Sequence, residues 1–135
     1  MSVAALRDQI KIRLDTIAGL TVYDVVPDQL IPPCAAVNLL SATPEQTFGR
    51  GDLTDYRFEV QLYVSGAGGI RNAQDRIDPY LATSSTGGIY GAIHGDRTLG
   101  GAAHGVFIAG FRDYGLKGEN GELMGATVDL TVMAS

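Results

Sequence analysis

Residues 73–101, AQDRIDPYLATSSTGGIYGAIHGDRTLGG, decide which class of fold this chain can adopt. Ala73, Ile77 and Leu81 recur every four residues, which predicts an amphipathic helix with one buried face. Residues 87–95 predict a second, shorter helix, and a double glycine closes the stretch. Two consecutive helices therefore divide a chain whose other segments mostly carry strand patterns.

The clearest strand pattern covers residues 52–65. Tyr56, Phe58 and Val60 alternate with charged or polar residues, and the alternation continues to Val64. A period of two with one apolar parity is typical of a strand that is buried on one face. We therefore expect a long strand with one face in the core.

Shorter strand patterns lie on both sides of the two helices. Residues 20–26 and 34–40 predict two strands before the long one. Residues 106–114 and 124–133 predict two more at the end of the chain. The glycine-rich segment 115–121 separates this last pair, so we expect an antiparallel hairpin there.

A further helix is predicted at the start of the chain, where Leu6, Ile10 and Leu14 recur on one face. The order is then one helix, three strands, two helices and two strands. It lacks the strict alternation of parallel βαβ folds. The sequence thus predicts a single α+β domain over residues 1–135. Its mostly antiparallel sheet has about five strands, with two or three helices packed on one face.

Length and composition limit the classes of function. The chain has 135 residues and a formal net charge of −5, and a domain of this size can bury a core without a metal or disulfide. The negative charge argues against tight binding to nucleic acid, because that affinity comes from Lys and Arg releasing counterions. No segment approaches the roughly 20 apolar residues of a membrane-spanning helix. Residues 1–17 carry charges throughout, so no signal peptide is expected.

Motifs with catalytic or ligand-binding spacing are not found. In residues 66–71, GAGGIR, Arg71 stands where a dinucleotide fingerprint needs its third glycine, so we expect a tight strand-to-helix turn. His94 and His104 lack the spacing of zinc ligands, and the single Cys34 is expected to be a small buried residue. We therefore expect no catalytic residue, no cofactor, no metal and no enzymatic activity.

Two groups of carboxylates need separate explanations. Asp75 and Asp78 are expected to form ion pairs with Arg71 and Arg76 on the exposed side of their helix. The second group comprises Asp52, Asp55 and Glu59. A shift in the pKa of these carboxylates would need a partner from a distant part of the chain, and the sequence does not identify one.

A turn is predicted at Asp96, Arg97 and Leu99, before the last two strands. The two charged side chains are expected to clamp the turn, with Leu99 in the core and glycines 100–101 allowing a tight reversal. Alternatively, the turn contacts a neighbouring subunit, and the sequence leaves both interpretations open.

Four passages resemble the tail terminator proteins of long-tailed bacteriophages, particularly those that infect actinobacteria. The first two are SVAALRDQIKIRLDTIAGLTVYDVVPDQLIPP and YRFEVQLYVS. The third is AQDRIDPYLATSS, and the fourth is GDRTLGG, which leads into the final hairpin FRDYG…GELMGATVDLTVMAS. Together they span nearly the whole chain, and their signature is architectural rather than catalytic.

The resemblance implies a virion structural protein, made in the host cytoplasm, that forms a hexameric ring at the head-proximal end of the tail. Such a ring caps the tube of major tail protein, stops its polymerisation and offers a docking surface to the head–tail connector or head stopper. DNA passes through the lumen without specific binding, and no membrane is involved. Two alternatives stay open: another neck or connector protein, and a small-ligand-binding α+β domain that uses the turn at 66–69.

Two loops are candidates for contact with the tube or the lumen because of their length and charge. One is the polar segment 41–51, which predicts a long connection, and the other is the tip of the final hairpin. The candidate residues are Glu45, Gln46, Thr47, Arg50 and Asp52 on the first loop, and Lys117, Glu119, Asn120 and Glu122 on the second.

Overall fold

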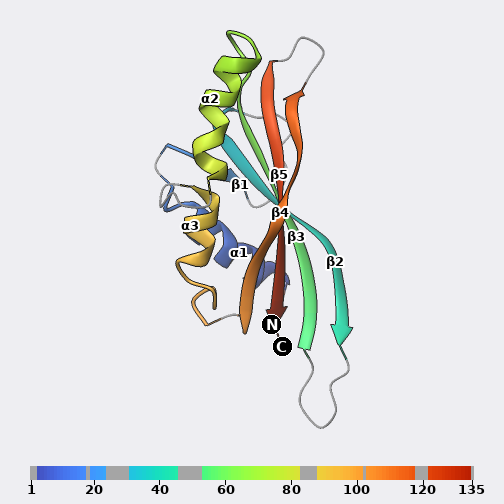
Figure 1. The fold of residues 1–135 in the computed structure, drawn as a ribbon. Coiled ribbons are helices and arrows are strands. Elements are labelled where there is room, and N and C mark those ends of the chain that lie inside the picture. Colours follow the sequence, from blue (N-terminus) through green and yellow to red (C-terminus); the bar gives the residue numbers. More distant parts are fainter. Residues whose placement is uncertain are drawn as a thin grey trace.

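In the described part of the chain, three helices cover one face of a five-stranded sheet, and no helix lies on the other face (Figure 1). The predicted α+β class is confirmed. The arrangement is that of a computed structural model, which describes residues 3–17, 19–23, 31–45, 53–82, 88–101, 103–117 and 122–134.

The helices are α1 (Val3–Leu14), α2 (Ile70–Leu81) and α3 (Ile89–His94). Each presents an apolar stripe to the sheet at the spacing that the sequence predicts. α1 ends at Leu14, and Ile17 beyond it is still buried. The buried stripe residues are Leu6, Ile10 and Leu14 of α1, Ala73 and Ile77 of α2, and Ile89, Ala92 and Ile93 of α3.

The strands lie in the order β1-β2-β3-β5-β4, with bounds β1 (Thr21–Tyr23), β2 (Cys34–Glu45), β3 (Leu53–Ser65), β4 (Gly105–Lys117) and β5 (Leu123–Ala134). β1 pairs in parallel with β2, and the other three pairings are antiparallel. The predicted hairpin of the last two strands is therefore confirmed. β1 pairs with only Cys34–Ala36 of β2, so β2 and β4 are the outermost long strands.

The alternation along β3 separates the two faces of the sheet. Its apolar parity, which includes Phe58, Val60 and Leu62, is fully buried beneath the helices. Its other parity, which includes Arg57, Glu59 and Gln61, lies on the opposite side. We call these two sides the helix face and the open face.

The long loop predicted at residues 41–51 is partly wrong, because Ser41–Glu45 continue β2. Thr43 pairs with Asp55 and Glu45 pairs with Leu53, so β3 supplies ladder partners to this polar segment. Pairing with a long neighbouring strand thus decides the conformation here, and local composition does not.

Two β-bulges flank a single row of the sheet. In this row Leu39 pairs with Phe58, Phe58 with Leu130, and Leu130 with Ile108. Directly beside the row, β2 shifts register at Leu40 and β4 shifts register between Ile108 and Gly110. Bulges increase local twist, and the strands in Figure 1 cross one another midway along their length.

A glycine on the hairpin allows an aromatic ring to pack closely against β5 on the open face. Gly125 of β5 pairs with Tyr63 on one side and with Gly115 on the other. A Cβ atom at Gly125 would lie 3.1 Å from two ring carbons of Tyr63 and 3.2 Å from Cγ of Lys117. The ring and the lysine stem therefore cover the glycine.

We predict that Gly125→Ala destabilises the protein by about 1–3 kcal/mol, because the added methyl group overpacks a filled position. The matched control is Gly115→Ala, where a Cβ atom meets nothing within 4 Å. That variant should be neutral or more stable by up to about 1 kcal/mol, since alanine has less freedom than glycine in the unfolded chain. Urea unfolding measures both, and equal effects would contradict the close contact with Tyr63.

Candidate interaction surfaces

A polar cluster occupies the centre of the open face. Glu59 of β3 is only 8% exposed although no helix covers that face. Its Oε1 accepts hydrogen bonds from Nδ2 of Asn38 and Nε2 of Gln61, each at 3.0 Å. Its Oε2 accepts a hydrogen bond from Nη2 of Arg112 at 2.8 Å. The cluster thus links strands β2, β3 and β4 through side chains.

Arg112 ties the outermost strand β4 to the centre of the sheet. Its guanidinium group contacts carboxylates of Glu59 at 2.8 Å, Asp113 at 2.8 Å and Asp129 at 3.2 Å. A planar guanidinium carries five N–H donors, so one side chain can serve several acceptors. One cation among three anions leaves this part of the open face with a net negative charge.

The electrostatics of Glu59 favour a structural role over acid–base chemistry. Burial by itself raises the pKa of Glu59, but hydrogen bonds from Asn38, Gln61 and Arg112 outweigh it, and the pKa lies below its usual value. Glu59 is therefore ionised at neutral pH. A general acid would instead need a raised pKa.

The two bulges and the polar cluster enclose a shallow hollow of about 270 Å³ on the open face. Its lining comes from strands β2 to β5, so the hollow spans most of the sheet. Within the described part of the chain, no group of three His, Cys, Asp or Glu residues could hold a metal ion. The hollow is lined by Leu40, Arg57, Ala109, Arg112, Asp129 and Thr131, among others.

Exposed apolar side chains gather on the outermost strand β4. Phe107 is 48% exposed, Phe111 53%, Tyr114 37% and Leu116 41%. Phe107 belongs to the open face and Phe111 to the helix face, because they pair with Thr131 and Val128. We call Phe107, Phe111, Tyr114 and Leu116 the β4 flank.

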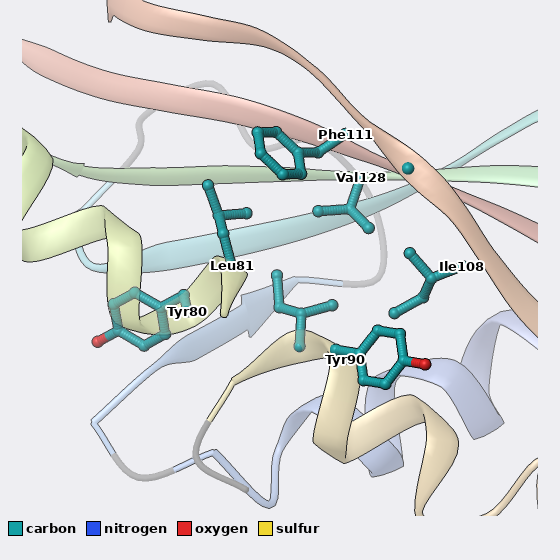
Figure 2. A pocket seen from close by; sticks show the side chains of 8 residues that line it. Tyr80, Leu81, Tyr90, Ile108, Phe111 and Val128 are labelled. Atoms are coloured by element: carbon teal, nitrogen blue, oxygen red, sulfur yellow. The ribbon is translucent and has the colours of Figure 1, made fainter. Parts of the chain in front are cut away.

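An apolar notch of about 200 Å³ opens beside the β4 flank on the helix face. It lies where the end of α2, the start of α3 and the middle of β4 meet. Figure 2 shows Leu81, Val128, Ile108 and Phe111 turned toward one space, while the hydroxyl groups of both labelled tyrosines point away from it. The remaining lining residues are Tyr80, Ile89, Tyr90 and Gly110. We call this hollow the notch.

Side-chain contacts hold β4 against the helices on both sides of the notch. The hydroxyl of Tyr114 donates to Oδ1 of Asp78 at 2.7 Å, and this hydrogen bond raises the pKa of Tyr114 to about 12. The amide of Ile108 donates to Nε2 of His94 at 3.4 Å. Burial, with the nearby Arg97, lowers the pKa of His94, so the ring is neutral and able to accept at neutral pH.

The turn predicted at Asp96 is present, with one difference. The Asp96 carboxylate accepts hydrogen bonds from the amide and hydroxyl of Thr98 and from the amide of Gly100, and these lower its pKa. Leu99 is fully buried with φ +49°. Arg97 does not form the predicted clamp with Asp96, and instead its guanidinium lies 6.0 Å from the ring centroid of Phe107. A contact between this turn and a neighbouring subunit stays a prediction.

Side chains of α2 hydrogen-bond the backbone of the glycine turn at 66–69. Nδ2 of Asn72 donates to the carbonyl of Gly68 at 2.8 Å. Nη1 of Arg76 donates to the carbonyl of Ala67 at 2.6 Å and to that of Ser65, the last residue of β3, at 2.9 Å. These contacts tie the carbonyls of the turn to the first turns of α2.

The ion pairs predicted along α2 are wrong. Within the described residues, no salt bridge joins Asp75 or Asp78 to Arg71 or Arg76. Arg76 is used by the glycine turn and Asp78 accepts from Tyr114. Both partners come from elsewhere in the fold, so helical spacing alone could not predict them.

The two loops chosen for tube or lumen contact begin at opposite ends of the sheet. Glu45 has its backbone in β2 rather than in a loop, which corrects that prediction. Lys117 ends β4, and Glu122 is exposed directly before β5. The length of β3 separates the two ends by about 40 Å at the usual rise per residue. The other candidates, Gln46, Thr47, Arg50, Asp52, Glu119 and Asn120, lie outside the described residues.

The sequence of β4 carries a signal for the β4 flank, because it departs from the alternation of a half-buried strand. A half-buried strand should be polar on one parity. Residues 106–108 and Phe111 are apolar on both parities, so this strand does not fit that pattern. An outer strand that is apolar on both sides is typical of a surface that another element covers.

Comparison with known proteins assigns no family to the chain. No family model matches it, and a search of curated proteins found no match. None of the described helices is long and apolar enough to span a membrane. Function is therefore inferred from the surfaces above, together with the resemblance of the four passages.

We predict that Glu59→Gln destabilises the protein by about 1–3 kcal/mol at pH 7, because it removes the charge that Arg112 pairs with in a nearly buried position. Folding lowers the pKa of Glu59, so its ionised carboxylate contributes fully to the free energy of unfolding above the unfolded pKa of about 4.3. This stabilisation is lost as the pH falls through the folded pKa. The gap between wild type and variant should therefore shrink in acid.

The matched control is Asp113→Asn, which removes an exposed partner of the same arginine and suits the positive φ of 57° at this position. It should change stability by less than about 1 kcal/mol. Denaturant unfolding at pH 7 and pH 3 measures both variants. A gap for Glu59→Gln that stays constant with pH would refute the ionised pair.

Proposed function

We propose that this chain is a tail terminator of a long-tailed bacteriophage. In this proposal its copies form a ring, a hexamer by the resemblance, that caps the tail tube and presents a second face to a head–tail connector. The observation that carries the proposal is the position of the exposed apolar side chains. Of the eight large ones in the described residues, five lie on the two outermost long strands and none lies on β3 or β5.

Exposed edges of this kind favour self-assembly over a solitary domain. Natural sheets protect their edge strands with charged residues, prolines or short strands. Here one edge carries two phenylalanines, a tyrosine and a leucine, and the other carries Leu40, which is 49% exposed. A closed ring needs two different complementary patches on each copy, and the two edges are such a pair.

The shape and charge of the subunit also suit the proposed role. A terminator must meet the tube on one side and a connector on the other. The two ends of this elongated sheet carry different connections, so they offer different surfaces to two partners (Figure 1). The net charge of −5 would make a ring acidic, so DNA could pass through it without adhering.

The test is assembly of the purified chain with and without the major tail tube protein of the same phage. We expect native mass measurement to find a ring of about six times the chain mass of 14.2 kDa. Electron microscopy should then show tubes with one capped end, and tube length should fall as the chain is added. A chain that stays monomeric at high concentration and leaves tubes unchanged would refute the proposal.

A phage that lacks the gene separates this role from the neighbouring ones. Loss of a terminator should give overlong tubes, because nothing stops polymerisation. Normal tails that fail to join leaking heads would instead assign the chain to a head stopper or adaptor. At the glycine turn, Asn72 and Arg76 donate to the carbonyls of Gly68 and Ala67, which supports a structural role for this turn between β3 and α2.

A further inference from the structure

We propose that His94 acts as a proton-sensitive latch on the outer edge of β4, where the neutral ring caps the backbone amide of Ile108 and a protonated ring releases it. The latch is built within one chain, so it goes beyond the proposed ring and does not depend on it. It keeps the middle of the β4 edge covered at neutral pH and opens it in mild acid.

The amide of Ile108 points away from the sheet. In the described part of the chain β4 is the last strand, and β5 is its strand neighbour. Alternate amides of such an edge strand face outward, where the sheet offers no acceptor. His94 lies at the end of α3, and its Nε2 accepts from the amide of Ile108 at 3.4 Å. The ring therefore covers an outward amide, directly beside the register shift between Ile108 and Gly110.

Both ring nitrogens of His94 face hydrogen-bond donors. Nε2 faces the amide of Ile108, and Nη2 of Arg97 lies 3.4 Å from Nδ1. A neutral imidazole has one nitrogen that accepts, so it can satisfy one of these donors. An imidazolium ring carries an N–H group at each nitrogen and accepts nothing. A protonated ring would therefore place its N–H groups opposite two donors, one of which is a cation.

The other ionisable groups around His94 do not compensate a proton on the ring. Tyr90 of α3 packs against it with ring centroids 4.0 Å apart, and Tyr80 of α2 lines the notch beside Tyr90. Arg13 of α1 donates to a carbonyl of α3, and β4 faces the ring with a backbone amide. The carboxylate of Asp96 accepts from groups of its own turn. Among the described residues no ion pair joins a carboxylate to His94.

The electrostatics of the ring agree with this geometry. Burial, and then the charge of Arg97, lowers the pKa of His94 below its usual value of 6.5. The ring in place thus binds a proton more weakly than a ring released into water. The closed latch is fully favoured above the usual pKa and loses this advantage as the pH falls through the lowered value. Acid therefore shifts the equilibrium toward the open latch.

Opening of the latch is a local change. Ile89 and Ile93 of α3 are buried, so the helix stays packed on the sheet while the His94 ring moves. The amide of Ile108 then faces solvent. Because Ile108 and Tyr90 both line the notch, the contact that holds α3 to β4 beside this hollow is lost as well.

Amide hydrogen exchange between about pH 7.5 and about pH 5 tests the latch. Rates are corrected for the intrinsic pH dependence of exchange, and Val60 on the central strand β3 is the internal reference. The protection of Ile108 relative to Val60 should fall about threefold or more as His94 takes up its proton. Glu59 stays ionised in this range because its pKa lies below 4.5. Constant relative protection across the range would overturn the proposal.

Matched variants separate the latch from other effects of acid. His94→Gln keeps an acceptor near the position of Nε2 but does not titrate, so the protection of Ile108 should not change with pH. His94→Ala removes the acceptor, so the protection should be low at every pH. His104 is present in both variants. A loss of protection in acid that persists in His94→Gln would belong to another group and would overturn the proposal.

A change of the neighbouring cation gives a second readout. Arg97→Gln removes the positive charge next to Nδ1, and Arg97 is exposed, so the fold should be unchanged by circular dichroism. The pKa of His94, followed by NMR of its ring, should rise, and the loss of protection at Ile108 should move to higher pH with it. An unchanged midpoint, or a ring that titrates while Ile108 stays protected, would contradict the latch.

Discussion

The alternation of apolar and polar residues along β3 is the constraint on which the rest of this structure depends. A strand has a side-chain period of two, so a shift of one residue would exchange the buried and exposed sets. Phe58, Val60 and Leu62 therefore direct one face of the sheet toward the helices, and all three helices collect there. Because the other parity holds Glu59 and its neighbours, the opposite face stays without a helix and becomes available for contacts.

An uncovered face can bury a carboxylate only if its hydrogen bonds are satisfied. Asn38, Gln61 and Arg112 meet that requirement for Glu59 and at the same time connect three strands. Arg112 has a further consequence, because it fixes the outermost strand to the sheet centre. β4 can then display apolar side chains at the edge without losing its place in the fold.

The bulges convert a regular sheet into one with distinct local surfaces. Two of them flank one level of the sheet, the row from Leu39 to Ile108, and β4 has a third register shift between Arg112 and Gly115. On the open face this level holds the hollow beside the polar cluster. On the helix face, β4 and the helices leave the notch at the same level. The two hollows therefore lie on opposite faces of the sheet at the level that the bulges at Leu40 and Ala109 flank.

The sequence by itself determined the element order, the α+β class, the final hairpin and the buried parity of β3, because these depend on local periodicity and turn residues. It also anticipated buried Leu99 and the turn at Asp96. Only the tertiary structure decided the rest. It extended β2 through Ser41–Glu45 and redirected Arg76 and Asp78 to partners on other elements. Each of these depends on a partner distant in the chain, and a periodicity measured within one segment contains no information about which distant segment will lie beside it.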